Sequence, residues 1–275
     1  MNLNSRLPDV GTSIFTVMSR MAQEHGAINL SQGFPDFEVS PALIDLIYKY
    51  LKAGHNQYAP MPGTPALRKA IADVITKTYQ RPTDFETEVT ITAGGTEALF
   101  STIAALVQKD DEVIVFDPAY DSYNPAIRLN GGVPKHISLN PPYFVIDWEQ
   151  VKHTITPRTR LIIINTPHNP TGSILREADL KQLESIVQAH NIIVLSDEVY
   201  ERIIFDNKSH ESVLKYPGLA QQSVAVFSFG KTFHATGWKV GYAVAPEHLT
   251  REIRKAHQFI TFSVNTPVQL ALAAR

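Results

Sequence analysis

The 275-residue sequence contains no cysteine. This absence excludes disulfide bonds, thiolate nucleophiles and zinc sites with cysteine ligands, and it is compatible with a reducing compartment. The first residues contain no apolar run of the signal-peptide type, and no later stretch approaches the roughly 18 apolar residues of a membrane-spanning helix. We therefore expect a cytoplasmic protein that has no membrane partner.

Strong charge of either sign is also missing. The formal net charge is −2, and lysines and arginines form no block, so nucleic acid is not an expected partner. None of the ten histidines lies within five positions of another, which excludes a zinc helix of the His-Glu-x-x-His type. We expect no metal site.

From residue 88 onward, short apolar runs alternate with helical patterns. Runs rich in valine and isoleucine indicate strands that are buried on both faces, so the sequence predicts an α/β fold with a mostly parallel sheet wrapped by helices. The predicted strands lie near 89–92, 113–117, 161–165, 192–197, 224–229 and 239–245, and the helices near 96–107, 179–189 and 246–258.

Two earlier helices are indicated by their ends. Ser40-Pro41 is typical of an N-cap followed by proline in the first turn, and Gly54 is typical of a helix end. Thr64-Pro65 predicts a second start, and the apolar face expected for this helix comprises Leu67, Ile71, Val74 and Ile75.

Polar residues gather where the predicted strands end. In parallel sheets the carboxyl ends of the strands form the usual binding site, so these residues are candidates for chemistry. They are Gly94-Gly95-Thr96, Asp117, the segment 165–169, Asp197 and the turn at 228–231.

Two familiar motifs are incomplete here. Gly230-Lys231-Thr232 resembles the end of a P-loop, but alanine stands at position 225, where that motif needs glycine. Ser228 resembles a hydrolase nucleophile, but valine stands at 226, where the first glycine is required. Nucleotide-binding and serine-hydrolase functions are therefore disfavoured.

The same positions suit an aldehyde cofactor with a phosphate group. Such a cofactor needs a lysine that bonds to the aldehyde, an acid beside its ring nitrogen, and donors for its phenolic and phosphate oxygens. Each residue also has an ordinary interpretation: Asp197 as an N-cap for a helix over 198–202, residues 169–172 as a turn, and Lys231 as a loop lysine.

Four motifs taken together are more specific. Asn-Pro-Thr-Gly at 169, Ser-Asp-Glu-Val-Tyr at 196, Ser-Phe-Gly-Lys-Thr at 228 and Gly-Trp-Lys-Val-Gly-Tyr at 237 resemble the class I/II aminotransferases of pyridoxal-phosphate (PLP) fold type I. The resemblance extends from Asn29 to the end of the chain and is nearest to the methionine, glutamine and kynurenine group. It implies PLP-dependent transfer of an amino group between a large uncharged L-amino acid and a 2-oxo acid.

The resemblance also implies roles for individual residues. Lys231 would bond to the cofactor and then act as the base that moves the substrate's α-proton. Asp197 would pair with the ring nitrogen, Tyr200 and Asn169 would donate to the phenolic oxygen, and Tyr120 would stack on the ring. The catalytic residues implied are Lys231, Asp197 and Tyr200.

The phosphate would be received by Gly95 and Thr96 at a helix N-terminus, together with Ser228 and Lys239. Glu97 departs from this pattern, because it adds a negative charge beside the expected phosphate site.

Further matches imply a homodimer and a substrate site. Tyr58 matches a tyrosine that reaches the phosphate in the neighbouring subunit. Gly33 matches the loop that meets the substrate's α-carboxylate, and Asn169 would also bind the substrate. Phe15 and Phe262 would line the side-chain pocket or else pack in the core.

The resemblance predicts two parts: residues 1–40 as a segment of a small domain, and 41–275 as the large PLP-binding domain. It also implies a C-terminal small domain carrying a carboxylate-binding arginine, for which this sequence has no counterpart. Two alternatives stay open. A PLP-dependent β-lyase would release pyruvate and ammonia from sulfur amino acids, and a catalytically impaired fragment would only bind PLP.

Overall fold

The computed structural model describes residues 4–33 and 37–275, and the chain divides into two compact units, Met1–Glu38 and Val39–Arg275. In the first unit, helix α1 (Ile14–Glu24) begins after Ser13, whose Oγ accepts a hydrogen bond from the backbone N–H of Thr16 at 3.3 Å. None of its residues is buried. The sequence pattern predicted no element here.

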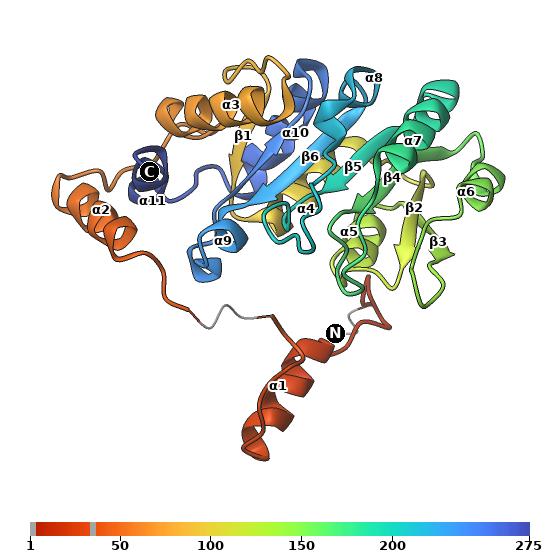
Figure 1. Cartoon of the computed structure of the whole chain (residues 1–275), viewed down its shortest axis with the longest axis horizontal. Helices are drawn as coiled ribbons and strands as arrows, with labels where there is room; N and C mark the ends of the chain where they lie inside the picture. The colour runs from red at the N-terminus through yellow and green to blue at the C-terminus, as the bar shows by residue number, and fades with distance from the viewer. Residues whose placement is uncertain (1–3, 34–36) are drawn as a thin grey trace. The chain divides into compact units, whose positions relative to one another are not determined.

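The second unit contains a seven-stranded sheet in the order β1-β7-β6-β5-β4-β2-β3 (Figure 1). The five strands from β6 to β3 pair in parallel, whereas β7 is antiparallel to both β6 and β1. The strand bounds are β1 Val89–Thr92, β2 Glu112–Asp117, β3 Val133–Ser138, β4 Thr159–Asn165, β5 Ile193–Asp197, β6 Ser223–Ser228 and β7 Gly241–Val244.

Helices cover both faces of this sheet (Figure 1). One core layer joins the sheet to α2 (Pro41–Lys52), α3 (Pro65–Tyr79), α6 (Trp148–Thr154), α7 (Glu177–His190), α8 (Pro217–Ala220) and α11 (Thr266–Ala273). The other layer joins it to α4 (Gly95–Leu106), α5 (Tyr123–Leu129) and α10 (Glu247–Ile260). Along β4 the side chains alternate between the layers, so the apolar run is buried on both sides. The remaining short helices are α9 (Phe229–Thr232), η1 (Val213–Lys215) and η2 (Thr236–Trp238).

The predicted fold class is confirmed, and several local predictions need correction. Val74 on α3 is 45% exposed, because the buried stripe runs through Leu67, Ile71 and Ile75 and turns away from it. Ser40 and Thr64 do stand at N-cap positions, but neither side chain makes a capping hydrogen bond. Within residues 4–33 and 37–275, no helix has the length and apolar character needed to span a membrane.

Candidate active site

The polar strand ends meet at one edge of the sheet. Asn165 at the end of β4 stands opposite Asp197 at the end of β5, which in turn stands opposite Val226 of β6. Because β7 is antiparallel, its first residue, Gly241, lies between Thr92 at the end of β1 and Ser228 at the end of β6. The carboxyl ends of the parallel strands and the start of β7 therefore form a single site, as the sequence predicted.

Asp197 is a buried acid of this site, with 3% of its surface exposed. Its carboxylate accepts hydrogen bonds from the Tyr123 hydroxyl at 2.6 Å and from the Val199 N–H at 3.3 Å. Burial raises its pKa from 3.8 to about 6, although both hydrogen bonds act in the opposite direction. Residues 199–202 form a turn and not a helix, so the interpretation of Asp197 as a helix N-cap is wrong.

Lys231 lies on α9, and its Nζ is 5.2 Å from the centroid of the Tyr200 ring. Burial is the largest effect lowering the pKa of this lysine, and the charge of Lys239 lowers it further, while Asp197 opposes the shift. Burial also raises the pKa of Tyr200, with a smaller contribution from Asp197. A half-buried amine whose positive charge is disfavoured is suited to act as a nucleophile or base.

Asn169 reaches the same group from the end of β4. Its Nδ2 donates to the Tyr200 hydroxyl at 3.5 Å, and its backbone N–H donates to Asn165 Oδ1 at 2.6 Å. Asn165 Nδ2 in turn donates to the Asp197 carbonyl oxygen at 2.9 Å. Asn165 thus fixes Asn169 and Asp197 relative to each other. The sequence had indicated only that Asn165 lies at a strand end.

The N-terminus of α4 lies next to Lys239, an arrangement suited to an anion. The first N–H groups of a helix have no partner within the helix, and its dipole favours negative charge there. Lys239 Nζ lies 3.2 Å from the position that a Cβ at Gly94 would occupy, so a side chain at 94 would crowd the lysine. Lys239 adopts a left-handed backbone (φ 54°) and precedes β7, which corrects the predicted strand start at 239.

Tyr120 and Tyr123 follow β2 and close another side of the site. The Tyr120 hydroxyl lies 3.3 Å from Thr96 Oγ1, and its ring stands edge-on to that of Tyr123 at 5.6 Å between centroids. Tyr123 is buried on α5 and was missed by the sequence analysis. Its only sequence signal was its position three residues after Tyr120, because its partner Asp197 lies 74 residues away.

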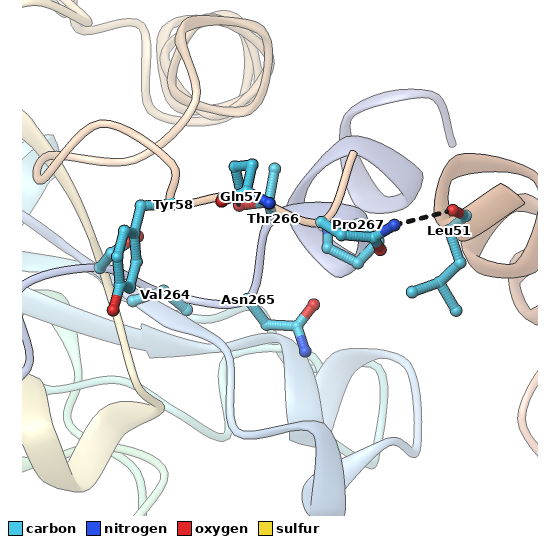
Figure 2. A pocket seen from close by; sticks show the side chains of 9 residues that line it. Leu51, Gln57, Tyr58, Val264, Asn265, Thr266 and Pro267 are labelled. Atoms are coloured by element: carbon cyan, nitrogen blue, oxygen red, sulfur yellow. Dashed lines mark hydrogen bonds between the residues drawn. The ribbon is translucent and has the colours of Figure 1, made fainter. Parts of the chain in front are cut away.

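For two predicted residues, Tyr58 and Gly33, the described part of the chain shows no contact with this cluster, and the reasons differ. Tyr58 is 81% exposed and contacts the Phe262 ring edge-on at 5.3 Å. It borders a groove that also includes Leu51, Val264 and Asn265 (Figure 2). Gly33 belongs to the first unit, so its contact with substrate stays a prediction, and residues 34–36 of the same loop lie outside the described residues.

Across the described ranges, no three histidine, aspartate or glutamate side chains gather as a metal site would require. The groups that the described residues bring together are an amine, a buried carboxylate, three phenols and a helix N-terminus beside a lysine.

The family model for aminotransferase class I and II matches residues 25–275. An Escherichia coli methionine aminotransferase is 54% identical over 269 residues, and the match covers 98% of this chain and 70% of that protein. A Dictyostelium discoideum kynurenine–oxoglutarate transaminase is 35% identical, with 96% of this chain and 65% of that protein covered.

Solved structures agree. The crystal structure of YbdL from Escherichia coli, described as having a methionine aminotransferase function, matches with a TM-score of 0.96 and 52% identity, covering 100% of this chain and 71% of that one. The N-succinyldiaminopimelate aminotransferase of Mycobacterium tuberculosis matches with a TM-score of 0.95 and 37% identity, covering 99% and 72%.

The described residues fit the cofactor of these enzymes, PLP. An amine with a lowered pKa suits its aldehyde, a buried carboxylate suits its ring nitrogen, and the corner formed by α4 and Lys239 suits its phosphate. The chain therefore belongs to the class I and II aminotransferases, PLP-dependent enzymes that transfer an amino group between an amino acid and a 2-oxo acid.

Proposed function

We propose that Lys231 is the catalytic base of amino transfer and that Asp197 and Tyr200 are its catalytic partners. One grouping carries the proposal. The half-buried amine of Lys231 and the buried carboxylate of Asp197 lie around Tyr200, at the ends of the neighbouring strands β5 and β6. When bound, PLP draws electrons from the substrate's α-carbon and so makes the α-proton acidic.

Lys231 would accept that proton at Nζ. Its lowered pKa favours the neutral amine, which is the form able to take up a proton. Asp197 would hold a proton at the cofactor's ring nitrogen, because a buried carboxylate gains most from a cationic neighbour. Tyr123, whose hydroxyl bonds to Asp197, is a positioning residue for this acid.

The remaining residues would bind and orient. Tyr200 and Asn169 would donate to the phenolic oxygen, and Tyr120 would stack on the ring. Gly95, Thr96, Ser228 and Lys239 would hold the phosphate. Asn169 and Gly33 would contact the substrate.

We also propose that the protein is a homodimer in which Tyr58 reaches the site of the partner subunit. Three observations support this. Tyr58 is 81% exposed on its own chain. Phe262 and Phe259 are 48% and 87% exposed, an arrangement typical of an interface rather than of free surface. The backbone beside Tyr58 is also held in place, since Thr266 Oγ1 donates to the Gln57 carbonyl oxygen at 2.6 Å.

The division of the chain at Glu38 supports the proposal that residues 1–40 belong to a small domain and residues 41–275 form the large PLP-binding domain. A cytoplasmic location remains a prediction from the sequence.

The proposed amino donor is a large uncharged L-amino acid, with methionine as the first choice because the Escherichia coli relative at 54% identity acts on it. The purified chain would be incubated with PLP, L-methionine and a 2-oxo acid, and the new amino acid would be quantified against Lys231→Ala. Amino-group transfer by the native chain alone is expected. Release of pyruvate and ammonia from sulfur amino acids without an acceptor would favour the β-lyase alternative.

A further inference from the structure

Glu97 presents an electrostatic problem for a phosphate site. It lies in the first turn of α4, in the same turn as Gly95 and Thr96, and a carboxylate there would repel a phosphate bound at the helix N-terminus. The structure shows what happens to this charge. Glu97 Oε2 accepts a hydrogen bond from the Ala93 N–H at 3.0 Å, and Oε1 accepts one from the Ser101 hydroxyl.

A histidine completes the arrangement. His257 of α10 has a fully buried side chain, and its Nδ1 lies 3.0 Å from Glu97 Oε1. Its Nε2 lies 3.0 Å from the carbonyl oxygen of Met61. A carbonyl oxygen can only accept a hydrogen bond, so Nε2 must carry a proton.

The second ring nitrogen then fixes the charge of the pair. An unprotonated Nδ1 facing an ionised carboxylate would bring two lone pairs together, so one further proton must lie between Nδ1 and Oε1. Whether that proton belongs to the imidazolium or to the carboxylic acid, the pair as a whole is neutral. His257 therefore cancels the charge of Glu97.

The same ring anchors a second segment. Met61 lies in the loop that carries Tyr58, and Ser263 Oγ also donates to this loop, at the Ala59 carbonyl oxygen, at 3.0 Å. His257 thus connects the first turn of α4 to the loop that, in the proposed dimer, contacts the partner's site.

We propose that His257 is a positioning residue for the cofactor phosphate, acting by neutralising Glu97 beside the N-terminus of α4. The inference rests on the proposed PLP site. It explains how a carboxylate in that turn is compatible with a phosphate site. It requires that His257 act on the charge of Glu97 and not on its shape.

The test compares the binding of PLP with that of pyridoxal, which lacks the phosphate. His257→Gln keeps a donor toward Met61 but leaves the charge of Glu97 without a compensating proton from the ring. Glu97→Gln removes the charge at constant size, and the double variant removes both groups. For His257→Gln we expect PLP affinity to fall about tenfold or more, equivalent to about 1.4 kcal/mol, while pyridoxal affinity stays within about twofold. Glu97→Gln and the double variant should bind PLP within about threefold of the native chain.

Two results would overturn the inference: equal weakening of PLP and pyridoxal binding, or a double variant no better than His257→Gln. If His257→Gln does not fold, Glu97→Gln alone decides, because a tenfold loss of PLP affinity there would show that the carboxylate charge is needed. Failure of the proposed function looks different. In that case the native chain itself would bind no PLP at Lys231, and the inference would fall with it.

Discussion

Replacing Tyr123 with phenylalanine removes a single hydroxyl, the one that donates to the Asp197 carboxylate at 2.6 Å. A hydrogen bond to a charged group contributes about 1.5–3 kcal/mol, and one between neutral groups about 0.5–1.5 kcal/mol. Since burial has already raised the pKa of Asp197 to about 6, the acid is ionised at pH 8 and mostly protonated at pH 5. The variant should therefore lose more stability at pH 8 than at pH 5.

The sign follows from the pKa. Loss of the hydroxyl raises the folded-state pKa of Asp197 further, and a raised carboxyl pKa means stability that is present at low pH and lost as the pH rises through it. We expect the loss of unfolding free energy to be about 1–2 kcal/mol larger at pH 8 than at pH 5, which corresponds to a change of roughly one unit in the pKa of Asp197.

The assay is urea unfolding of the PLP-free protein at pH 5 and pH 8. Tyr123→Phe in an Asp197→Asn background is the matched control, in which the pH dependence of the loss should vanish. An equal loss at both pH values, or an undiminished pH dependence in the control, would refute the role given to this hydrogen bond.

Three further predictions concern neighbouring features. Asp197→Asn should stabilise the PLP-free protein by about 1–3 kcal/mol at pH 8 and not at pH 4, because an uncharged group avoids the burial cost that raises the pKa of Asp197 to about 6. With PLP and substrate bound, the same variant should slow proton transfer by about 10²-fold or more, and a native-like rate would contradict the role of Asp197. Lys239→Gln should raise the pKa of Lys231 by removing a neighbouring positive charge. The pH profile for the rate at which Lys231 bonds to pyridoxal should then have its midpoint at a higher pH, and an unchanged midpoint would argue against the coupling of the two lysines. Gly63→Ala should lower the free energy of unfolding in urea by about 2 kcal/mol or more, because φ is +104° and the new Cβ would lie 2.1 Å from Ile91 Cγ1. Gly54→Ala is the control, with φ +88° and open space around the new Cβ, and should cost less. Similar losses in the two variants would show that the clash at position 63 is relieved.

Much of the sheet could be predicted from local pattern, because buried parallel strands are continuous apolar runs. Strands β2, β4, β5 and β6 have this character, whereas β1 (Val-Thr-Ile-Thr) is buried but alternates apolar residues with threonine. All five strands lie within a residue or two of their predicted positions. β3 was missed because it forms the edge of the sheet and has proline, lysine and histidine at 134–136, with only Ile137 buried. α5 was missed because Pro125 in its first turn resembles a loop signal.

The site was predictable at strand ends and unpredictable where helices meet it. Asn169, Asp197, Tyr200 and Lys231 follow strands, so their grouping follows from the sheet itself. The contact of Glu97 with His257 spans 160 residues and depends on how α10 packs against α4, which no local pattern encodes.

The central claim is that Lys231 alone bonds to the cofactor. The most direct measurement is borohydride reduction of the chain with PLP, followed by intact mass and peptide mapping. The account predicts one phosphopyridoxyl group, located on Lys231 and absent from Lys231→Ala. A label on another lysine, or full labelling of Lys231→Ala, would contradict it.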